Sequence, residues 1–181
     1  MFWLKRLFTS VQIMRSKTAR RMKKRIVAVS GGFDPIHIGH VRLLNEARKL
    51  GDKLVVILNN DNWLFAKKGF IFMSELDRKE ILESLEVVDE VMLTSHKKND
   101  SDRSVCRELW KLRPHIFANG GDRNVADSKK KSSSLNSEAV LCERLGIKAM
   151  FNVGKGGKLR SSTELVSRFK KDSKHDKTPF S

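Results

Sequence analysis

Cysteine is scarce in this chain of 181 residues, which contains only Cys106 and Cys142. The two lie far apart in the sequence and lack the close spacing of metal-binding cysteines. We therefore expect ordinary buried thiols in a reducing compartment, which favours the cytoplasm. The sequence also lacks an apolar run of membrane-spanning length, so no membrane-spanning helix is predicted.

Acidic residues are absent from residues 1–33, which contain nine Lys or Arg. This segment holds over half of the excess positive charge, which is formally +16 for the whole chain. Signatures of helix-turn-helix proteins, zinc fingers and aromatic RNA-binding domains are absent too. Nucleic acid is therefore not favoured as a partner, although the basic segment leaves it open as an alternative.

Residues 1–23 predict a basic amphipathic N-terminal extension, because Leu4, Leu7 and Val11 recur at helical spacing among basic residues. Three explanations stay open: a mitochondrial transit peptide, a helix in contact with a membrane surface, or untranslated sequence ahead of a start at Met22. We expect one folded domain over residues 24–169 and a disordered tail over residues 170–181.

The most informative stretch is Gly31–His40, which reads GGFDPIHIGH. A short apolar run precedes it and predicts a buried parallel strand, and helical periodicity follows it as far as Gly51. Such a glycine-rich turn between strand and helix presents backbone N–H groups and a positive helix end to an anion.

The residue types in this turn suit phosphate. Gly31 and Gly32 allow a ligand to approach the backbone closely, and Phe33 and Asp34 follow directly. His37 and His40 are three positions apart at the start of the helix, so their imidazoles can face one pocket and donate hydrogen bonds to phosphate oxygens. We predict that all six residues belong to a nucleotide site, with His37 and His40 as catalytic residues.

The rest of the chain alternates between strand-like and helix-like segments, as in a doubly wound α/β fold. Parallel strands are predicted at residues 25–30, 53–58, 87–93, 114–118 and 148–151. Helices are predicted over residues 41–50, from Ser74 through Leu85, across Val105–Leu112, and at residues 138–145 and 161–169. Residues 59–73 are predicted to form a loop, and residues 127–134 a mobile low-complexity run.

The Gly31–His40 stretch resembles the HxGH signature of the cytidylyltransferase-like nucleotidyltransferase family, including glycerol-3-phosphate cytidylyltransferase and the heptose-1-phosphate adenylyltransferase domain. The resemblance implies a Rossmann-like five-stranded parallel sheet of order 3-2-1-4-5. It also implies an enzyme that transfers CMP or AMP from CTP or ATP to a sugar or polyol phosphate and releases pyrophosphate. Its partners would be a nucleoside triphosphate and a phosphorylated acceptor, and a homodimer stays open.

The resemblance also suggests site residues after the second strand. Asp61 and Lys67 occupy positions that face the triphosphate and acceptor in the family, so Lys67 is predicted to be catalytic. Gly69 replaces a further family lysine, for which Lys68 is a candidate substitute. Arg78 is expected on the helix face away from Leu82, pointing at phosphate or at a subunit interface.

Two later segments complete the predicted site. Asp122 ends the fourth strand, where its carboxylate could reach a ribose hydroxyl or the base. Ser161, Ser162 and Thr163 resemble a family segment that opens a helix toward phosphate, with Arg160 as a further contact. The Arg-Thr-x-Gly element that precedes this segment in cytidylyltransferases is missing here, which leaves ATP at least as plausible as CTP.

We expect no protein nucleophile, because in-line transfer to an acceptor phosphate requires alignment and charge stabilisation. No carboxylate cluster suggests a protein metal site, so Mg²⁺ is expected to arrive on the nucleotide phosphates. The alternatives are a non-catalytic nucleotide-binding regulatory protein on the same fold, and a nucleic-acid-associated protein that uses the basic arm.

Overall fold

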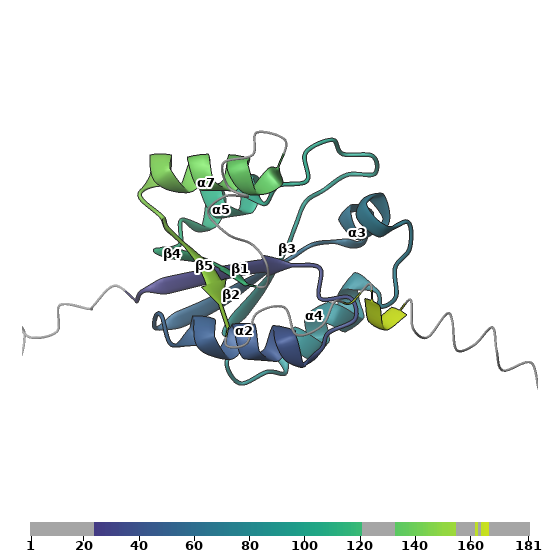
Figure 1. Cartoon of the computed structure of the whole chain (residues 1–181), viewed down its shortest axis with the longest axis horizontal. Coiled ribbons are helices and arrows are strands. Elements are labelled where there is room, and N and C mark those ends of the chain that lie inside the picture. Colours follow the sequence, from purple (N-terminus) through teal and green to yellow (C-terminus); the bar gives the residue numbers. More distant parts are fainter. Residues whose placement is uncertain (1–23, 121–132, 155–161, 163, 167–181) are drawn as a thin grey trace, which may run out of the picture.

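The computed structural model describes residues 24–120, 133–154, 162 and 164–166. It contains a five-stranded, wholly parallel sheet of order β3-β2-β1-β4-β5, with helices on both faces (Figure 1). The predicted α/β class and strand order are confirmed. The strands are β1 (Ile26–Gly31), β2 (Lys53–Leu58), β3 (Glu90–Leu93), β4 (Ile116–Gly120) and β5 (Lys148–Val153).

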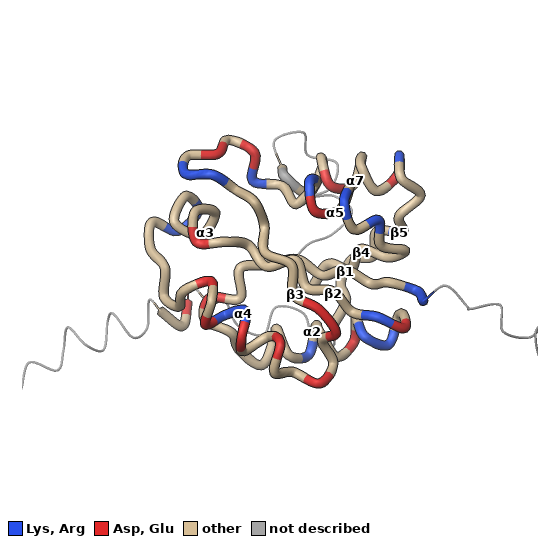
Figure 2. The backbone as a smooth tube through the Cα atoms, turned by 180° about the vertical axis from the view of Figure 1, so that it is seen from behind, with Lys and Arg blue, Asp and Glu red and all other residues tan. Residues whose placement is uncertain are grey.

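The centre of the sheet is apolar because helices cover both of its faces. β1 pairs with β2 over its whole length, from Ile26 opposite Lys53 to Gly31 opposite Leu58. On its other side it pairs with β4. Neither β1 nor β4 contains a charged residue, and the charges lie mainly in the helices, loops and outer strands (Figure 2).

Alternate strand residues face two separate cores. On one face, Val27, Val29 and Val56 pack against α2 (Ile38–Arg48) and α4 (Glu75–Glu83). On the other, Ala28, Ile57 and Phe117 pack against α5 (Cys106–Leu112) and α7 (Ser134–Leu145). This two-sided packing fixes where each βα turn emerges at the carboxyl edge of the sheet.

The prediction of a loop over residues 59–73 is wrong for its first half, which forms α3 (Asp61–Lys68). Asn60 caps this helix, since its side chain accepts a hydrogen bond from the backbone N–H of Trp63 at 3.1 Å. Gly69 ends it in the left-handed region, with a φ of 74°. An Asn cap, an acid in the first turn, two lysines in the last turn and a closing glycine are the ordinary signals of a helix.

Other element boundaries differ by a few residues. β3 begins at Glu90 rather than at residue 87, because Val88 donates to the carbonyl of Leu85 and closes a turn. α7 begins at Ser134, four residues before the predicted start, and β5 extends to Val153. The predictions for residues 1–23, 127–132 and 170–181 fall outside the described residues.

None of the described helices is long and apolar enough to cross a membrane.

Candidate active site

The histidine turn lies at the carboxyl edge of the sheet, between the end of β1 and the start of α2. His37 is the residue that caps α2, and His40 lies in the first turn of this helix. The two imidazole rings stack, with centroids 3.8 Å apart and planes at 19°. The prediction that both side chains project to one place is supported by this geometry.

Both imidazoles use their Nδ1 atoms to cap the helix. His37 Nδ1 accepts from the backbone N–H of Gly39 at 3.1 Å, and His40 Nδ1 accepts from the backbone N–H of His37 at 3.3 Å. This reciprocal arrangement is a capping box made of two histidines. Two backbone N–H groups of the turn are thereby occupied by protein atoms and are not offered to a ligand.

The capping bonds fix the chemistry of the rings. A backbone N–H can only donate, so both Nδ1 atoms must be acceptors, and a neutral ring then carries its proton on Nε2. In each neutral ring the donor N–H is therefore Nε2–H. Gly39 permits this packing, because a Cβ there would lie 2.9 Å from the His37 ring.

His40 is neutral in this environment. Burial, followed by the nearby charges of His37 and Lys68, lowers the pKa of His40 from 6.5 to about 3. It thus adds no positive charge to the helix end at neutral pH. An anion bound beside the ring would oppose these effects and raise the pKa.

The residues before the histidines support the turn from inside. Phe33 is buried with a φ of 50°, and its ring meets that of His40 edge to face at 4.9 Å. At Gly32 a Cβ would lie 2.7 Å from Leu64 Cδ2. Gly32 thus permits α3 to approach the turn closely, whereas we expected it to permit the close approach of a ligand.

Asp34 ties the turn to the linker between α3 and α4. Its carboxylate is buried and accepts from the backbone N–H groups of Phe72 at 3.1 Å and Met73 at 2.8 Å. Its predicted role as a nucleotide contact is therefore not what its side chain does in this structure. Asp34 holds the histidine turn and the α3–α4 linker in place relative to each other.

Of the two lysines that end α3, it is Lys68 that reaches the histidine turn. Lys68 Nζ donates to the carbonyl of Asp34 at 2.6 Å, and its side chain is only 15% exposed. Burial lowers the pKa of Lys68, with Asp34 opposing and Arg78 adding to the shift. Lys67, predicted to be catalytic, instead has its ammonium 4.5 Å from the ring centroid of Trp63.

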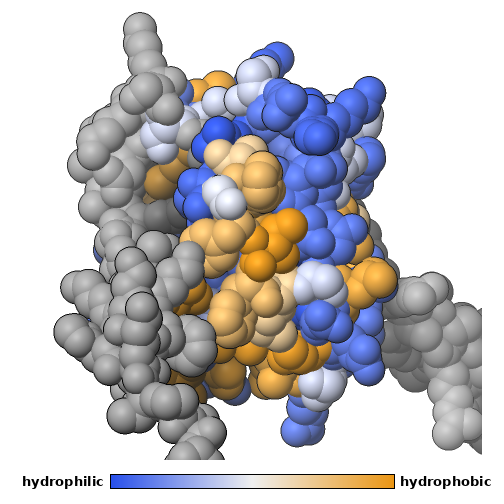
Figure 3. All heavy atoms as spheres, turned by 90° about the vertical axis from the view of Figure 1, so that its right-hand side faces the viewer, coloured by the Kyte–Doolittle hydropathy of each residue, from blue (hydrophilic) through white to orange (hydrophobic). Residues whose placement is uncertain are grey.

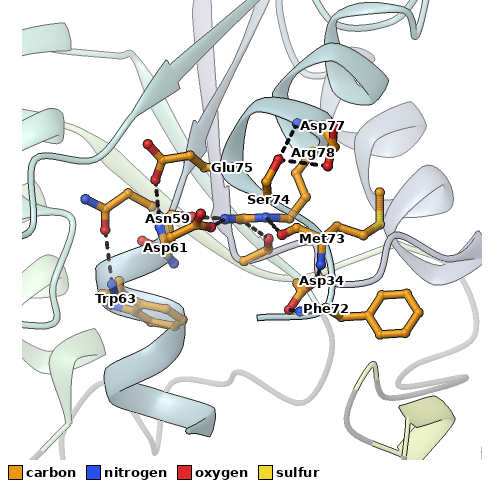
Figure 4. A network of polar contacts seen from close by, with 12 residues as sticks. Asp34, Asn59, Asp61, Trp63, Phe72, Met73, Ser74, Glu75, Asp77 and Arg78 are labelled. Atoms are coloured by element: carbon orange, nitrogen blue, oxygen red, sulfur yellow. Dashed lines mark hydrogen bonds and ion pairs between the residues drawn. The ribbon is translucent and has the colours of Figure 1, made fainter. Parts of the chain in front are cut away.

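Arg78 is the largest departure from the sequence-based expectation (Figure 4). It lies on the buried face of α4 together with Leu82, and the residue is only 1% exposed. Its guanidinium donates to three backbone carbonyls, those of Gly32 (2.7 Å), Asn59 (2.8 Å) and Met73 (3.0 Å).

Asp61, predicted to face the substrates, completes this network, because its Oδ1 accepts from Arg78 Nη2 at 2.6 Å. These bonds occupy four of the five N–H groups of the guanidinium. Arg78 is thus a positioning residue that joins the ends of β1 and β2 to the α3–α4 linker. The expectation that it lies away from Leu82 is wrong.

The C-terminal part of the predicted site is described only in part. Ser162 Oγ donates to the carbonyl of Pro35 at 3.0 Å, so Ser162 lies against the histidine turn. Asp122, Arg160, Ser161 and Thr163 lie outside the described residues.

Comparison with known proteins identifies relatives across most of the chain. A family model described as cytidylyltransferase-like matches residues 28–167. The chain is 35% identical to an FAD synthase of Thermococcus sibiricus over 65% of this chain and 80% of that protein. It is 33% identical to an FAD synthase of Ferroglobus placidus over 81% of this chain and 88% of that protein.

A further relative is much longer. The bifunctional protein HldE of Koribacter versatilis is 34% identical over 59% of this chain, which spans only 21% of that protein. Among solved structures, a lipopolysaccharide core biosynthesis protein from Thermoplasma volcanium has a TM-score of 0.55 and 26% identity. That match covers 74% of this chain and 99% of the other.

Proposed function

Since the chain belongs to the cytidylyltransferase-like family of nucleotidyltransferases, we propose that it transfers AMP from ATP to a phosphorylated small molecule. The observation that carries this proposal is the stacked histidine pair at the start of α2, whose Nδ1 atoms cap the helix and whose donor N–H is then Nε2–H. A pair of imidazole N–H donors at the positive end of a helix suits a polyphosphate.

The reaction is an in-line displacement. An oxygen of the acceptor phosphate forms a bond to the α-phosphorus of ATP, the bond from that phosphorus to the α–β bridging oxygen breaks, and pyrophosphate leaves with the electron pair. Negative charge grows on the leaving group, where the Nε2–H donors and the Lys68 ammonium would stabilise it. No protein nucleophile takes part.

ATP is proposed on the strength of the relatives. The product that gives FAD synthase its name is flavin mononucleotide joined to AMP, so an enzyme of that name transfers AMP. HldE relatives with the heptose adenylyltransferase domain also transfer AMP. The acceptor is less constrained, since one relative implies a flavin phosphate and the other a sugar phosphate.

Mg²⁺ is proposed to bind as part of the nucleotide substrate. No group of three potential ligands among His, Cys, Asp and Glu occurs within the described residues. The carboxylates of Asp34 and Asp61 already bind backbone N–H groups and Arg78, respectively. Mg²⁺ would therefore enter on the triphosphate, where it neutralises phosphate charge.

Several expectations stay proposals. Asp122 would contact the ribose or base, and Arg160, Ser161, Ser162 and Thr163 would contact the phosphates. We also propose a cytoplasmic location and a homodimer.

The test is a matrix of the four nucleoside triphosphates against phosphorylated acceptors, read as pyrophosphate release with Mg²⁺ present. We expect turnover with ATP and at least one acceptor, and a loss of about a hundredfold or more in His40→Ala. A kcat/KM for CTP about tenfold above that for ATP would overturn the choice of nucleotide, while absence of pyrophosphate with every pair would overturn the activity.

A further inference from the structure

The carboxyl edge of the sheet exposes apolar side chains beside the histidine pair. Ile38 (50% exposed) directly follows His37, Phe65 (58%) lies on α3, and Ile71 (40%) and Phe72 (54%) lie in the linker to α4. We call these four residues the apolar rim. The face of the molecule at this end carries an apolar area at its centre, with hydrophilic residues above it and to its right (Figure 3).

The rim is built into the elements that form the site. The backbone N–H of Phe72 is bound by the buried Asp34 carboxylate, and the ring of Phe72 points away from this network (Figure 4). The backbone carbonyl of Asp34 also accepts a hydrogen bond from Lys68 Nζ at 2.6 Å. The apolar surface is therefore held at a fixed place relative to the predicted phosphate donors.

Leaving two phenylalanines and two isoleucines about half exposed is unfavourable in water, and contiguous apolar surface commonly marks a binding site. Here one end of the surface adjoins imidazole N–H groups and an ammonium. A ligand that fits both parts carries a phosphate at one end and an apolar ring system at the other.

We infer that the acceptor is a phosphate ester of a planar aromatic ring system, seated on the apolar rim. This inference rests on the proposed function for the reaction, but its binding part can be tested separately. Phenylalanine faces stack on planar rings. A sugar phosphate would instead place hydroxyl groups against Phe and Ile side chains, where they lose water without gaining hydrogen-bond partners.

The experiment uses flavin mononucleotide as the probe and riboflavin as the same ring system without phosphate. Binding to the full chain is followed by quenching of flavin fluorescence, and turnover with ATP by pyrophosphate release. Phe72→Ala and Phe65→Ala test the rim. Trp110→Ala is the matched control, because Trp110 is equally exposed (57%) but lies on α5, which packs on the sheet face that α2 and α4 do not cover.

We expect Phe72→Ala to weaken the binding of both flavins about tenfold and to leave the KM for ATP within twofold. Phe72→Trp should retain binding, because it restores an aromatic face. Trp110→Ala should behave as the unchanged protein does. Flavin binding that neither Phe72→Ala nor Phe65→Ala weakens would overturn the inference.

The remaining outcomes separate the two proposals. A kcat/KM for glucose 1-phosphate or glycerol 3-phosphate equal to or above that for flavin mononucleotide would overturn the inference while upholding the reaction. Rim-dependent flavin binding without pyrophosphate release from any acceptor would uphold the aromatic site and overturn the reaction. A dimer by light scattering that Phe72→Ala dissociates, with flavin binding unaffected, would make the rim a subunit contact and overturn the inference.

Discussion

At the scale of single residues, His37 has two separable tasks. Its Nδ1 caps α2, and its Nε2–H is proposed to meet phosphate. His37→Asn should preserve the first task, since Asn is among the best capping residues, and abolish the second. We expect unfolding free energy close to that of the unchanged protein and turnover lower by about a hundredfold or more.

His37→Ala is the matched variant, because it removes both tasks. It should lose the same turnover and in addition about 1 kcal/mol of stability, measured by urea unfolding. If Asn and Ala were equally destabilising, the capping role would be wrong. If His37→Asn kept near-normal turnover, the proposed catalytic role of His37 would be wrong.

His40 should make stability depend on pH. Its pKa is about 3 in the folded protein and 6.5 when unperturbed. Between these pH values the unfolded chain binds more protons than the folded one, so stability falls as pH drops from 6.5 toward 3. His40→Asn removes this titration and keeps a side-chain oxygen for the His37 N–H.

Urea unfolding between pH 4.5 and 7 should therefore show a shallower pH dependence for His40→Asn than for the unchanged protein. Equal slopes would mean that His40 titrates normally in the fold.

Lys68, rather than Lys67, is the lysine that the structure couples to the histidines. The charge of Lys68 contributes to the lowered pKa of His40, after burial and His37. Lys68→Met keeps the side-chain stem and removes the charge, so the pKa of His40 should rise, as measured by NMR titration of the imidazole. Its kcat/KM for ATP should fall at least about tenfold.

Lys67→Met is the control, because the Lys67 ammonium lies over Trp63. Lys67→Met should leave the pKa of His40 unchanged and should lower turnover less than Lys68→Met does. The opposite ranking of the two variants would restore Lys67 as the catalytic lysine.

At the scale of elements, one buried arginine joins three segments. Arg78 on α4 binds the carbonyls that follow β1 and β2 and the carbonyl of Met73 before α4. Arg78→Met would leave those carbonyls and Asp61 without their donor inside the protein. We expect a loss of about 3–5 kcal/mol in unfolding free energy.

Lys79→Met is a matched control from the same helix. Its partner Glu83 is 3.4 Å away, and the two side chains are 36% and 46% exposed. An exposed pair of this kind contributes about 0–1 kcal/mol, so the variant should unfold close to the unchanged protein. A similarly small effect of Arg78→Met would show that Arg78 does not hold the segments together.

The elements with a clear pattern of apolar residues were predictable from the sequence. β2 is observed at the predicted residues 53–58, because a β-branched run buried on both faces has few alternatives. α3 was not predicted because its apolar residues give it only a short buried face, so no helical period stands out. The Asn60 cap and the closing Gly69 indicate this helix better than its periodicity does.

The site was predictable in its residue types and less so in their partners. Sequence indicates that two histidines meet at a helix start, since spacing alone decides this. It does not reveal that their Nδ1 atoms cap the helix, nor that Arg78 turns inward. Those facts depend on which backbone groups lie within reach once β1, β2 and α4 are packed.

At the scale of the whole molecule, the contacts that tie the chain into the described fold begin at Arg25. The backbone N–H of Arg25 donates to Asp52 Oδ2 at 2.7 Å, and β1 begins at the next residue. The histidine turn, the Arg78 network and the apolar rim are all built from residues after this point. Residues 1–21 carry six basic and no acidic side chains.

A chain that begins at Met22 should therefore keep its fold and its turnover. We expect its unfolding midpoint in urea and its kcat/KM for ATP to stay within about twofold of those of the full chain, because no described contact of the site is removed. Binding to anionic vesicles or to nucleic acid, if the full chain shows it at low salt, should weaken strongly with this deletion, since such binding depends on counterion release by basic residues. A large loss of soluble protein or of turnover would instead make the N-terminal segment part of the enzyme, and the domain would then begin well before β1.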